Sequence, residues 1–230
     1  MEKRYSLLLE LGLLTALVVI SAALRLYQLA DVPPGLHGDE ALTGLDALRV
    51  LNEGWIGPYV GSGLGQPSGP LYWTALVFNL FGASAFSLRA SMAVLGILTI
   101  PAAYLLYRTM FNARAAALGA ALLAISHWHI HYSRTAFMLI SMPLVVALAL
   151  FLLFKGFRSQ SWVFFPAGGV LLGLGLYTYN VFPLFLAAVA VLYVMKLAKD
   201  AGNRRRLLPQ FGIFWAAALA SAFPFLAFAV

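Results

Sequence analysis

Residues 87–107 read SLRASMAVLGILTIPAAYLLY, and this apolar run decides the fold class. A helix that spans a bilayer needs about 20 mostly apolar residues. Similar runs recur along the chain, and each predicts a membrane-spanning helix. The predicted spans are Leu7–Leu29, Ser87–Tyr107, Ala115–Tyr132, Ala136–Phe154, Trp162–Thr178, Val181–Met195 and Leu207–Val230. The sequence therefore predicts an all-α integral membrane protein with about seven transmembrane helices.

The overall composition supports this prediction. Hydrophobic residues make up 62% of the chain and charged residues only 10%, whereas about a quarter of the residues of a soluble domain are charged. The net charge of +7 would also suit a nucleic-acid partner. However, the basic residues fall in small clusters between apolar runs, which is typical of topology signals. We therefore expect membrane lipid and no nucleic acid as a partner.

The distribution of basic residues predicts the orientation. With the N-terminus in the cytoplasm, 11 of the 15 basic residues fall on the cytoplasmic side, as the positive-inside rule requires. These are Lys3, Arg4, Arg108, Arg114, Lys155, Arg158, Lys196, Lys199, Arg204, Arg205 and Arg206. The stretch Leu71–Phe81 is too short to cross, and counting it as a span would place the last three arginines outside. We therefore expect a multi-pass protein of the cell (inner or plasma) membrane.

The organisation that follows is a single N-terminal transmembrane module over residues 1–230. Residues 31–86 form its outer loop, with interfacial helices that include Leu71–Phe81. Because the chain stops at Val230 inside an apolar run, we expect a C-terminal part to be missing.

The outer loop contains the most informative polar residues. Asp39 follows a Pro-Pro-Gly turn and stands where a helix would begin, since Leu42, Leu45 and Leu48 recur at helical spacing. Asp is a common N-cap. The N-terminus of a helix also favours an ionised carboxylate, which a general base needs. The sequence leaves both roles open.

Other polar residues near the predicted outer helix ends have two possible interpretations each. Arg25, Arg89 and Arg134 either extend to the interface or bind a phosphate there, which suits guanidinium geometry. His127 and His131 share a helix face and could hold a divalent metal ion, or they are ordinary interfacial histidines.

The order of several motifs resembles one known family. The first helix ends in LRLYQL, followed by HGDEA, QPSGPLYW, SHWHIHYSR and GLYTYN. This order is similar to that of the GT-C superfamily of membrane glycosyltransferases. The protein O-mannosyltransferase and aminoarabinose-transferase branch is the most similar part of that superfamily.

The resemblance implies a function. Family members transfer a sugar from a polyprenyl-phosphate carrier to an acceptor outside the cytoplasm, with inversion at the anomeric carbon. Asp39 matches their catalytic base by position. The candidate substrate-binding residues are Glu40, Arg25, Gln66, Pro70, Tyr72, Arg89, Arg134 and Tyr179. The acceptor could be a protein, a lipid or a glycan.

The chain also departs from the family pattern. Many relatives have a second acid after the third span, but TAFMLISMPL at residues 135–144 has none. Without this acid, the chain lacks one expected ligand for a metal ion that would bridge the donor phosphate. A divalent metal ion is therefore the one cofactor considered, and the sequence does not establish it. Two alternatives stay open: a transporter or flippase subunit, and an inactive assembly subunit with the same fold.

Overall fold

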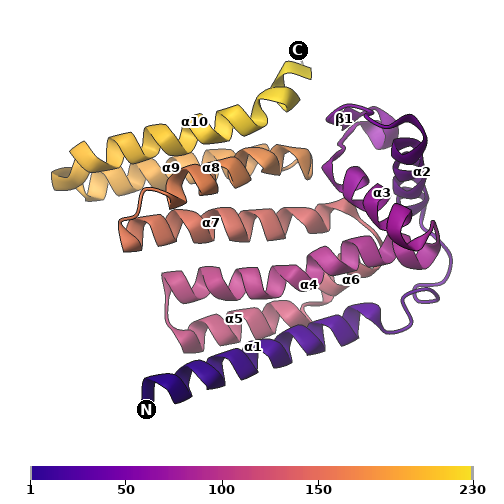
Figure 1. Ribbon diagram of the computed structural model, residues 1–230, viewed down its shortest axis with the longest axis horizontal. Helices are drawn as coiled ribbons and strands as arrows, with labels where there is room; N and C mark the ends of the chain where they lie inside the picture. Colours follow the sequence, from indigo (N-terminus) through magenta and orange to yellow (C-terminus); the bar gives the residue numbers. More distant parts are fainter. Residues whose placement is uncertain (1, 229–230) are drawn as a thin grey trace.

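The computed structural model describes residues 2–228, and side chains from residue 8 onward. Predictions that concern the side chains of Lys3 and Arg4 and the chain end at Val230 lie outside the described residues. Helices lie side by side to form one bundle (Figure 1). Its members are α1 (Glu2–Leu26), α4 (Ala85–Met110), α5 (Ala113–Ile125), α7 (Ser141–Ser159), α8 (Phe164–Leu174), α9 (Pro183–Lys199) and α10 (Arg204–Phe228).

Four helical segments are long and apolar enough to cross a bilayer, judged by length and composition. They are Leu8–Leu26, Ala85–Met110, Met138–Ser159 and Ala201–Phe228 within the described residues. The segments Ala113–Ile125 and Phe164–Tyr177 are apolar but shorter. The protein is therefore a multi-pass membrane protein whose predicted spans differ in length. α5, for example, extends only about 20 Å at 1.5 Å per residue.

The prediction of one continuous helix over Ala115–Tyr132 is wrong. The helix ends at Ile125, and α6 (His127–Arg134) begins after Ser126, whose ψ of 120° is not helical. Breaking a helix leaves carbonyl groups without partners. Arg25 of α1 supplies one partner by donating to the carbonyl of Ala124 at 3.1 Å. The apolar periodicity of the sequence carried no sign of this long-range contact.

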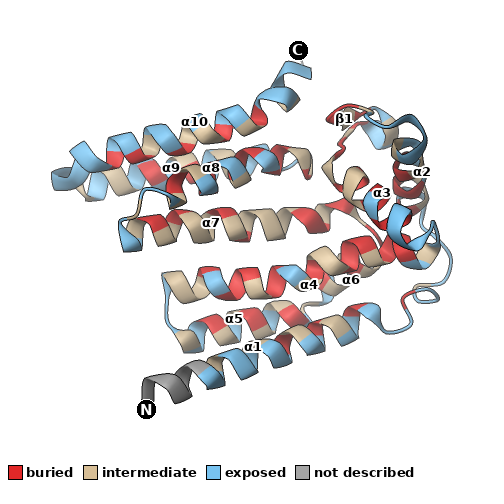
Figure 2. Cartoon of the chain, in the orientation of Figure 1, coloured by how far each residue is buried: buried red, intermediate tan, exposed pale blue. Residues whose placement is uncertain are grey.

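The centre of the bundle is α4. In the apolar 18-residue stretch of each candidate span, 56% of α4 is buried, against 17% for α1 and for α10. Figure 2 shows the difference as exposed faces along the two outer helices. α4 packs against α7, α5 and α1, while α8 packs closely against α10. This arrangement places the N-terminal end of α4 beside the outer loop.

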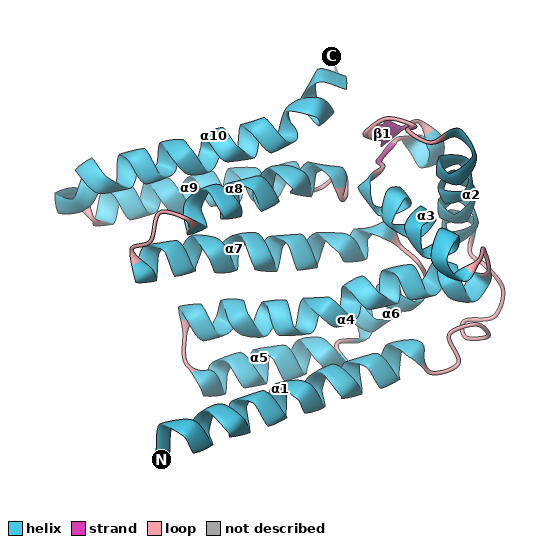
Figure 3. Ribbon diagram, viewed as in Figure 1, coloured by secondary structure: helices cyan, strands magenta, loops and turns pink. Residues whose placement is uncertain are grey.

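The segment between α1 and α4, which the sequence predicts as an outer loop, folds into a cap at one end of the bundle. It consists of α2 (Gly38–Glu53), strand β1 (Tyr59–Val60), the short helix η1 (Ser62–Leu64), strand β2 (Gln66–Pro67) and α3 (Gly69–Phe81). The strands pair antiparallel, with Tyr59 opposite Pro67 and Val60 opposite Gln66. In Figure 3 the strand colour appears only in this region. The expected helix at Leu71–Phe81 is thus present and begins two residues earlier.

α3 is fastened to the bundle by polar contacts. The indole N–H of Trp73 donates to the carbonyl of Ser91 at 2.7 Å, and the hydroxyls of Thr74 and Ser91 are 3.0 Å apart. Leu71 and Phe78 pack into the same apolar cluster as Met92 of α4. The cap is therefore anchored on the most buried helix.

The leucine face of α2 is only partly packed: Leu48 packs against the apolar cluster that contains Leu71 and Met92. Leu45 and Leu51 are 63% and 41% exposed. The buried residues of α2 are instead Glu40, Thr43, Gly44, Asp46 and Ala47. An exposed apolar face together with a buried polar face fits a helix that lies against lipid rather than water.

Candidate active site

A cavity at the inner face of the cap brings together residues that are far apart in the sequence. It is lined by Asp39, Leu42, Thr43, Gly63, Gln66, Phe137, Met138 and Tyr179. Three of the predicted site residues, Asp39, Gln66 and Tyr179, therefore meet here from three separate segments. Asp39 is the single carboxylate among these lining residues.

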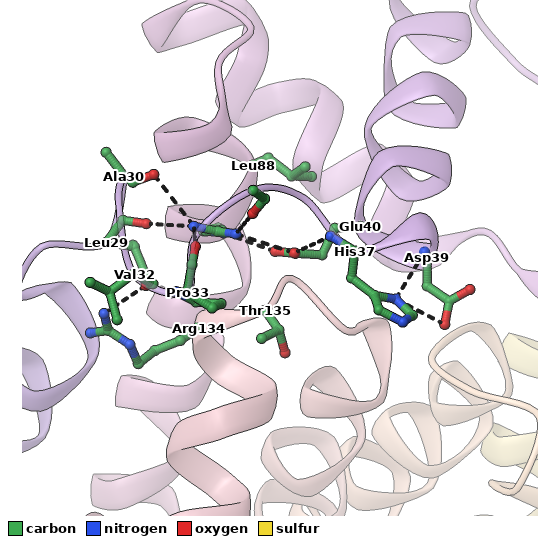
Figure 4. Close-up of polar contacts among 12 residues, drawn as sticks. Leu29, Ala30, Val32, Pro33, His37, Asp39, Glu40, Leu88, Arg134 and Thr135 are labelled. Carbon is green, nitrogen blue, oxygen red and sulfur yellow. Dashed lines mark hydrogen bonds and ion pairs between the residues drawn. The ribbon is translucent and has the colours of Figure 1, made fainter.

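The start of α2 sets the position of Asp39. Its N-cap is His37, not Asp39, because His37 Nδ1 accepts the backbone N–H of Asp39 at 3.2 Å. The N-cap role considered for Asp39 is thus filled by another residue. The carboxylate of Asp39 lies 3.6 Å from His37 Nδ1, and its side chain is 64% exposed (Figure 4). Asp39 therefore has a carboxylate that is open to a reactant.

Glu40, the next residue, points in the opposite direction. Its side chain is 1% exposed, forms an ion pair of 2.9 Å with Arg89, and accepts the backbone N–H of His37 at 2.9 Å. Both carboxylate oxygens are thus engaged, and Glu40 does not line the Asp39 cavity. The geometry gives Glu40 a supporting role instead of the expected contact with substrate.

Arg89 is fully buried, and its guanidinium group bonds to protein atoms on all sides. Besides Glu40, it donates to the carbonyls of Leu29 at 3.2 Å and Pro33 at 2.9 Å, and to that of Gly35. An arginine has five N–H donors, and these contacts occupy them. The structure therefore differs from the expected phosphate-binding role: Arg89 fixes the loop that leads into α2.

Arg25 is likewise fully buried and engaged. It donates to the hydroxyls of Ser21 at 2.8 Å and Ser133 at 3.3 Å, and its NH2 group lies 2.8 Å from His129 Nδ1. The expected donor-binding role does not fit these contacts. Arg25 instead joins α1 to the broken α5–α6 segment.

Arg134 caps the end of α1. It donates to the carbonyls of Leu24 at 3.1 Å, Tyr27 at 2.8 Å and Val32 at 2.8 Å. A cation at a helix C-terminus is stabilised by the helix dipole. Burial, and then the charge of Arg89, lowers the pKa of the Arg134 guanidinium. Its contacts are thus those of a residue that orders the segment between α1 and α2.

Pro70 and Tyr72 do not line the cavity. Pro70 is buried in the first turn of α3. The hydroxyl of Tyr72 accepts the N–H of Ile56 and donates to the carbonyl of Gly57, both at 2.9 Å, and its ring stacks on Trp55. Tyr72 therefore secures the segment between α2 and the hairpin, a contact that the sequence did not reveal.

Gln66 and Tyr179 are held in place by neighbouring contacts. Gln66 donates to Ser62 at 3.4 Å, and the Ser62 hydroxyl bonds to the buried carboxylate of Asp46. Next to Tyr179, Asn180 donates to the carbonyl of Gly65 at 2.8 Å. A Cβ on Gly69 would lie 2.5 Å from the carbonyl of Tyr177. The segment 177–180 and the hairpin are therefore in close contact and form one wall of the cavity.

The histidine pair His127 and His131 is not part of a larger group of possible metal ligands among the described residues. The rings of His127 and His131 stack with their centroids 6.2 Å apart, as their shared helix face predicts. His129 points toward Arg25 instead. Among the described residues, no group of three or more His, Cys, Asp or Glu side chains could hold a metal ion. Within the described residues, His127 and His131 therefore form a stacked pair that is not part of such a group.

Comparison with known proteins identifies the family. Residues 66–228 match the model of the dolichyl-phosphate-mannose-protein mannosyltransferase family. The chain belongs to this family. No curated protein matches it by sequence.

Two solved structures share the fold, which is of the GT-C type. The oligosaccharyltransferase of Archaeoglobus fulgidus, in the apo form, has a TM-score of 0.74 at 20% identity, over 94% of this chain and 29% of its own. ArnT from Cupriavidus metallidurans, bound to undecaprenyl phosphate, has a TM-score of 0.69 at 19% identity, over 96% of this chain and 41% of its own. The chain thus spans less than half the length of either neighbour.

Proposed function

We propose that this chain forms the catalytic membrane module of a glycosyltransferase that uses a polyprenyl-phosphate sugar. The acceptor lies on the non-cytoplasmic face, and the N-terminus is cytoplasmic. One observation carries the proposal: Asp39 is an open carboxylate in a cavity that Gln66 and Tyr179 also line. Membership of the mannosyltransferase family supports the sugar chemistry. The structure of ArnT bound to undecaprenyl phosphate supports the carrier.

In the proposed reaction Asp39 is the general base. Its carboxylate takes the proton of the acceptor hydroxyl, and the acceptor oxygen bonds to the anomeric carbon. The bond between that carbon and the phosphate oxygen breaks, and the polyprenyl phosphate leaves with the electron pair. A single displacement of this kind inverts the anomeric centre. A positioned general base typically accelerates such a reaction about 10²–10⁴-fold.

The leaving phosphate needs hydrogen-bond donors. Arg25 and Arg89 are already engaged inside the protein, so we assign this role to groups that line the cavity. Gln66 and Tyr179 carry suitable donors, and the N-terminus of α2 adds a partial positive charge. Donors of this kind act most strongly when fixed before the reaction starts. The contacts of Ser62 and Asn180 on either side supply that rigidity.

The orientation across the membrane follows the same proposal. The α1–α2 and α3–α4 connections lie at the end of the bundle that carries the cap, and the α4–α5 and α7–α8 connections lie at the other end (Figure 1). Arg108, Arg114 and Arg158 belong to the second end, which we assign to the cytoplasm by the positive-inside rule. The cap then faces the compartment in which the lipid-linked sugar is used.

The test is sugar transfer by the full-length protein. Labelled polyprenyl-phosphate sugars are supplied in membranes, and the Asp39→Asn variant is compared with the wild type. We expect the rate to fall by about 10²–10⁴ with an unchanged thermal unfolding midpoint. Asp31→Asn is the matched control, because Asp31 is also exposed in this loop but does not line the cavity. Retained transfer by Asp39→Asn would refute the assignment.

A further inference from the structure

The end of the bundle that lies away from the cap carries a dense group of cations. The α7–α8 and α9–α10 connections both lie at this end (Figure 1). Residues 155–160 and 196–206 together contain seven basic residues and a single acid, Asp200. The basic residues are Lys155, Arg158, Lys196, Lys199, Arg204, Arg205 and Arg206. The positive-inside rule predicts the side of the membrane on which such residues lie, but it does not require them to meet in space.

Contacts across the connections bring cations of three helices together at the end of α7. The ammonium group of Lys196, in α9, lies 5.4 Å from the centroid of the Phe157 ring. Arg206, in α10, donates to the carbonyl of Gln160 at 3.1 Å. Arg158 of α7 stands between these two contact points in the sequence. Positive charge from α7, α9 and α10 therefore converges around residues 157–160.

The two arginines of this group keep donors that are open to a ligand. In the described structure, Arg158 donates to the carbonyl of Thr109 at 2.9 Å, and Arg206 donates to that of Gln160. Both residues are exposed, and a guanidinium group has five N–H donors. Arg89 differs, because protein atoms occupy its donors. The remaining donors of Arg158 and Arg206 suit the oxygens of a phosphate group.

Exposed apolar side chains adjoin the cations. Val194 and Met195 directly precede Lys196 in α9, and Leu208 follows Arg206 in α10; all three apolar side chains are exposed. A ligand that joins a negative charge to hydrocarbon chains matches both the cations and these side chains. A free phosphate ion matches the cations alone.

We propose that this end of the bundle binds the head group of an anionic phospholipid. The phosphodiester accepts hydrogen bonds from Arg158 and Arg206, and its acyl chains lie against the exposed apolar side chains of α9 and α10. Basic groups between transmembrane helices bind anionic head groups in this way. The bound lipid connects the end of α7 to α9 and α10. This site is separate from the Asp39 cavity and does not depend on the proposed sugar transfer.

The test measures which lipid gathers at the α9–α10 connection of the full-length protein. A fluorophore is attached to Gly202→Cys, where an added Cβ meets nothing within 4 Å and residues 1–230 contain no other cysteine. The protein is placed in phosphatidylcholine vesicles with a small fraction of spin-labelled phosphatidylglycerol or spin-labelled phosphatidylcholine as quencher. Each basic side chain near the anionic head group strengthens binding about fivefold. We expect phosphatidylglycerol to quench at a mole fraction about tenfold lower or less.

Charge removal should abolish most of this preference. Arg158→Gln combined with Arg206→Gln keeps an N–H donor at each position but removes both charges. We expect the preference for phosphatidylglycerol to fall about tenfold, with an unchanged unfolding midpoint in phosphatidylcholine. Arg49→Gln, exposed on α2 in the cap, is the matched control and should keep the preference.

Salt gives a readout on the wild-type side chains, so the test does not depend on the folding of the double variant. Raising NaCl from about 0.1 M to about 1 M shortens the Debye length from about 10 Å to about 3 Å and should reduce the preference. Equal quenching by the two lipids, or a preference that survives high salt, would overturn the proposal. Excess inorganic phosphate should leave the preference in place, because it lacks acyl chains. Complete displacement by inorganic phosphate would identify a free-anion site and refute the lipid assignment.

Discussion

At the residue scale, two adjacent acids have opposite environments. Asp39 is exposed and lines a cavity, whereas Glu40 is buried against Arg89. The arrangement follows from the helix start, since the first turn of α2 directs successive side chains to different faces. One acid is therefore free to react, and its neighbour orders the loop that places it.

The Arg89–Glu40 pair gives a prediction about stability. Replacing Arg89 with Met leaves the Glu40 charge buried and unpaired, and breaking such a pair costs about 3–5 kcal/mol. We expect the thermal unfolding midpoint in detergent to fall markedly. The double variant Arg89→Met with Glu40→Gln removes the unpaired charge and should recover part of the loss.

The same variants distinguish a direct role in donor binding. If Arg89 were a phosphate ligand, Arg89→Met would weaken donor affinity while leaving the unfolding midpoint unchanged. That result would contradict the structural role assigned here to its contacts with the carbonyls of residues 29–35.

The sequence predicted the start of α2 to within one residue and the start of α3 to within two, because apolar spacing and turn residues are local signals. It could not predict the partners of the arginines. The carbonyls that Arg89 and Arg134 bond belong to the last turn of α1 and to the irregular backbone between α1 and α2, and no residue type marks a free carbonyl. The same limit explains why the cap by His37 was missed, since histidine is not among the preferred N-cap residues.

At the element scale, the close packing of α8 on α10 depends on glycine. A Cβ at Gly169 would lie 2.1 Å from the carbonyl oxygen of Phe214, and one at Gly173 would lie 2.1 Å from that of Ala218. Small residues at a membrane helix interface let the backbones approach closely. The contact continues toward the end of the bundle that carries the cap, where Phe225 N–H donates to the Tyr177 hydroxyl at 3.0 Å. The wall of the Asp39 cavity thus rests on this helix pair.

A substitution at the interface tests this dependence. Gly169→Ala forces α8 and α10 apart, and overpacking of this kind costs about 1–3 kcal/mol. Gly212→Ala in α10 is the control, because nothing lies within 4 Å of its added Cβ. We expect a lower unfolding midpoint for Gly169→Ala only. Equal midpoints for the two variants would contradict the close approach.

The break between α5 and α6 shows a second limit of sequence reasoning. Residues 115–132 have the apolar content of a single span, yet Ser126 leaves the helical conformation. The contacts that stabilise the break come from Arg25, about a hundred residues earlier in the chain. A pattern within one segment cannot report such a partner.

At the scale of the whole molecule, the bundle and its cap have separate roles. The helices place the module in lipid, and the cap gathers Asp39, Gln66 and Tyr179 at one end. The site is thus formed where a lipid carrier could present its head group while its chain stays in the bilayer. The proposed function requires the cap to face the non-cytoplasmic side.

The sequence has no cysteine, so single introduced thiols can report the position of each end. We predict that intact cells carrying Asp39→Cys react with a membrane-impermeant maleimide. Gly202→Cys, at the connection between α9 and α10, should react only after the membrane is permeabilised. Labelling of Gly202→Cys in intact cells, with Asp39→Cys protected, would place the cap in the cytoplasm and contradict the proposed reaction.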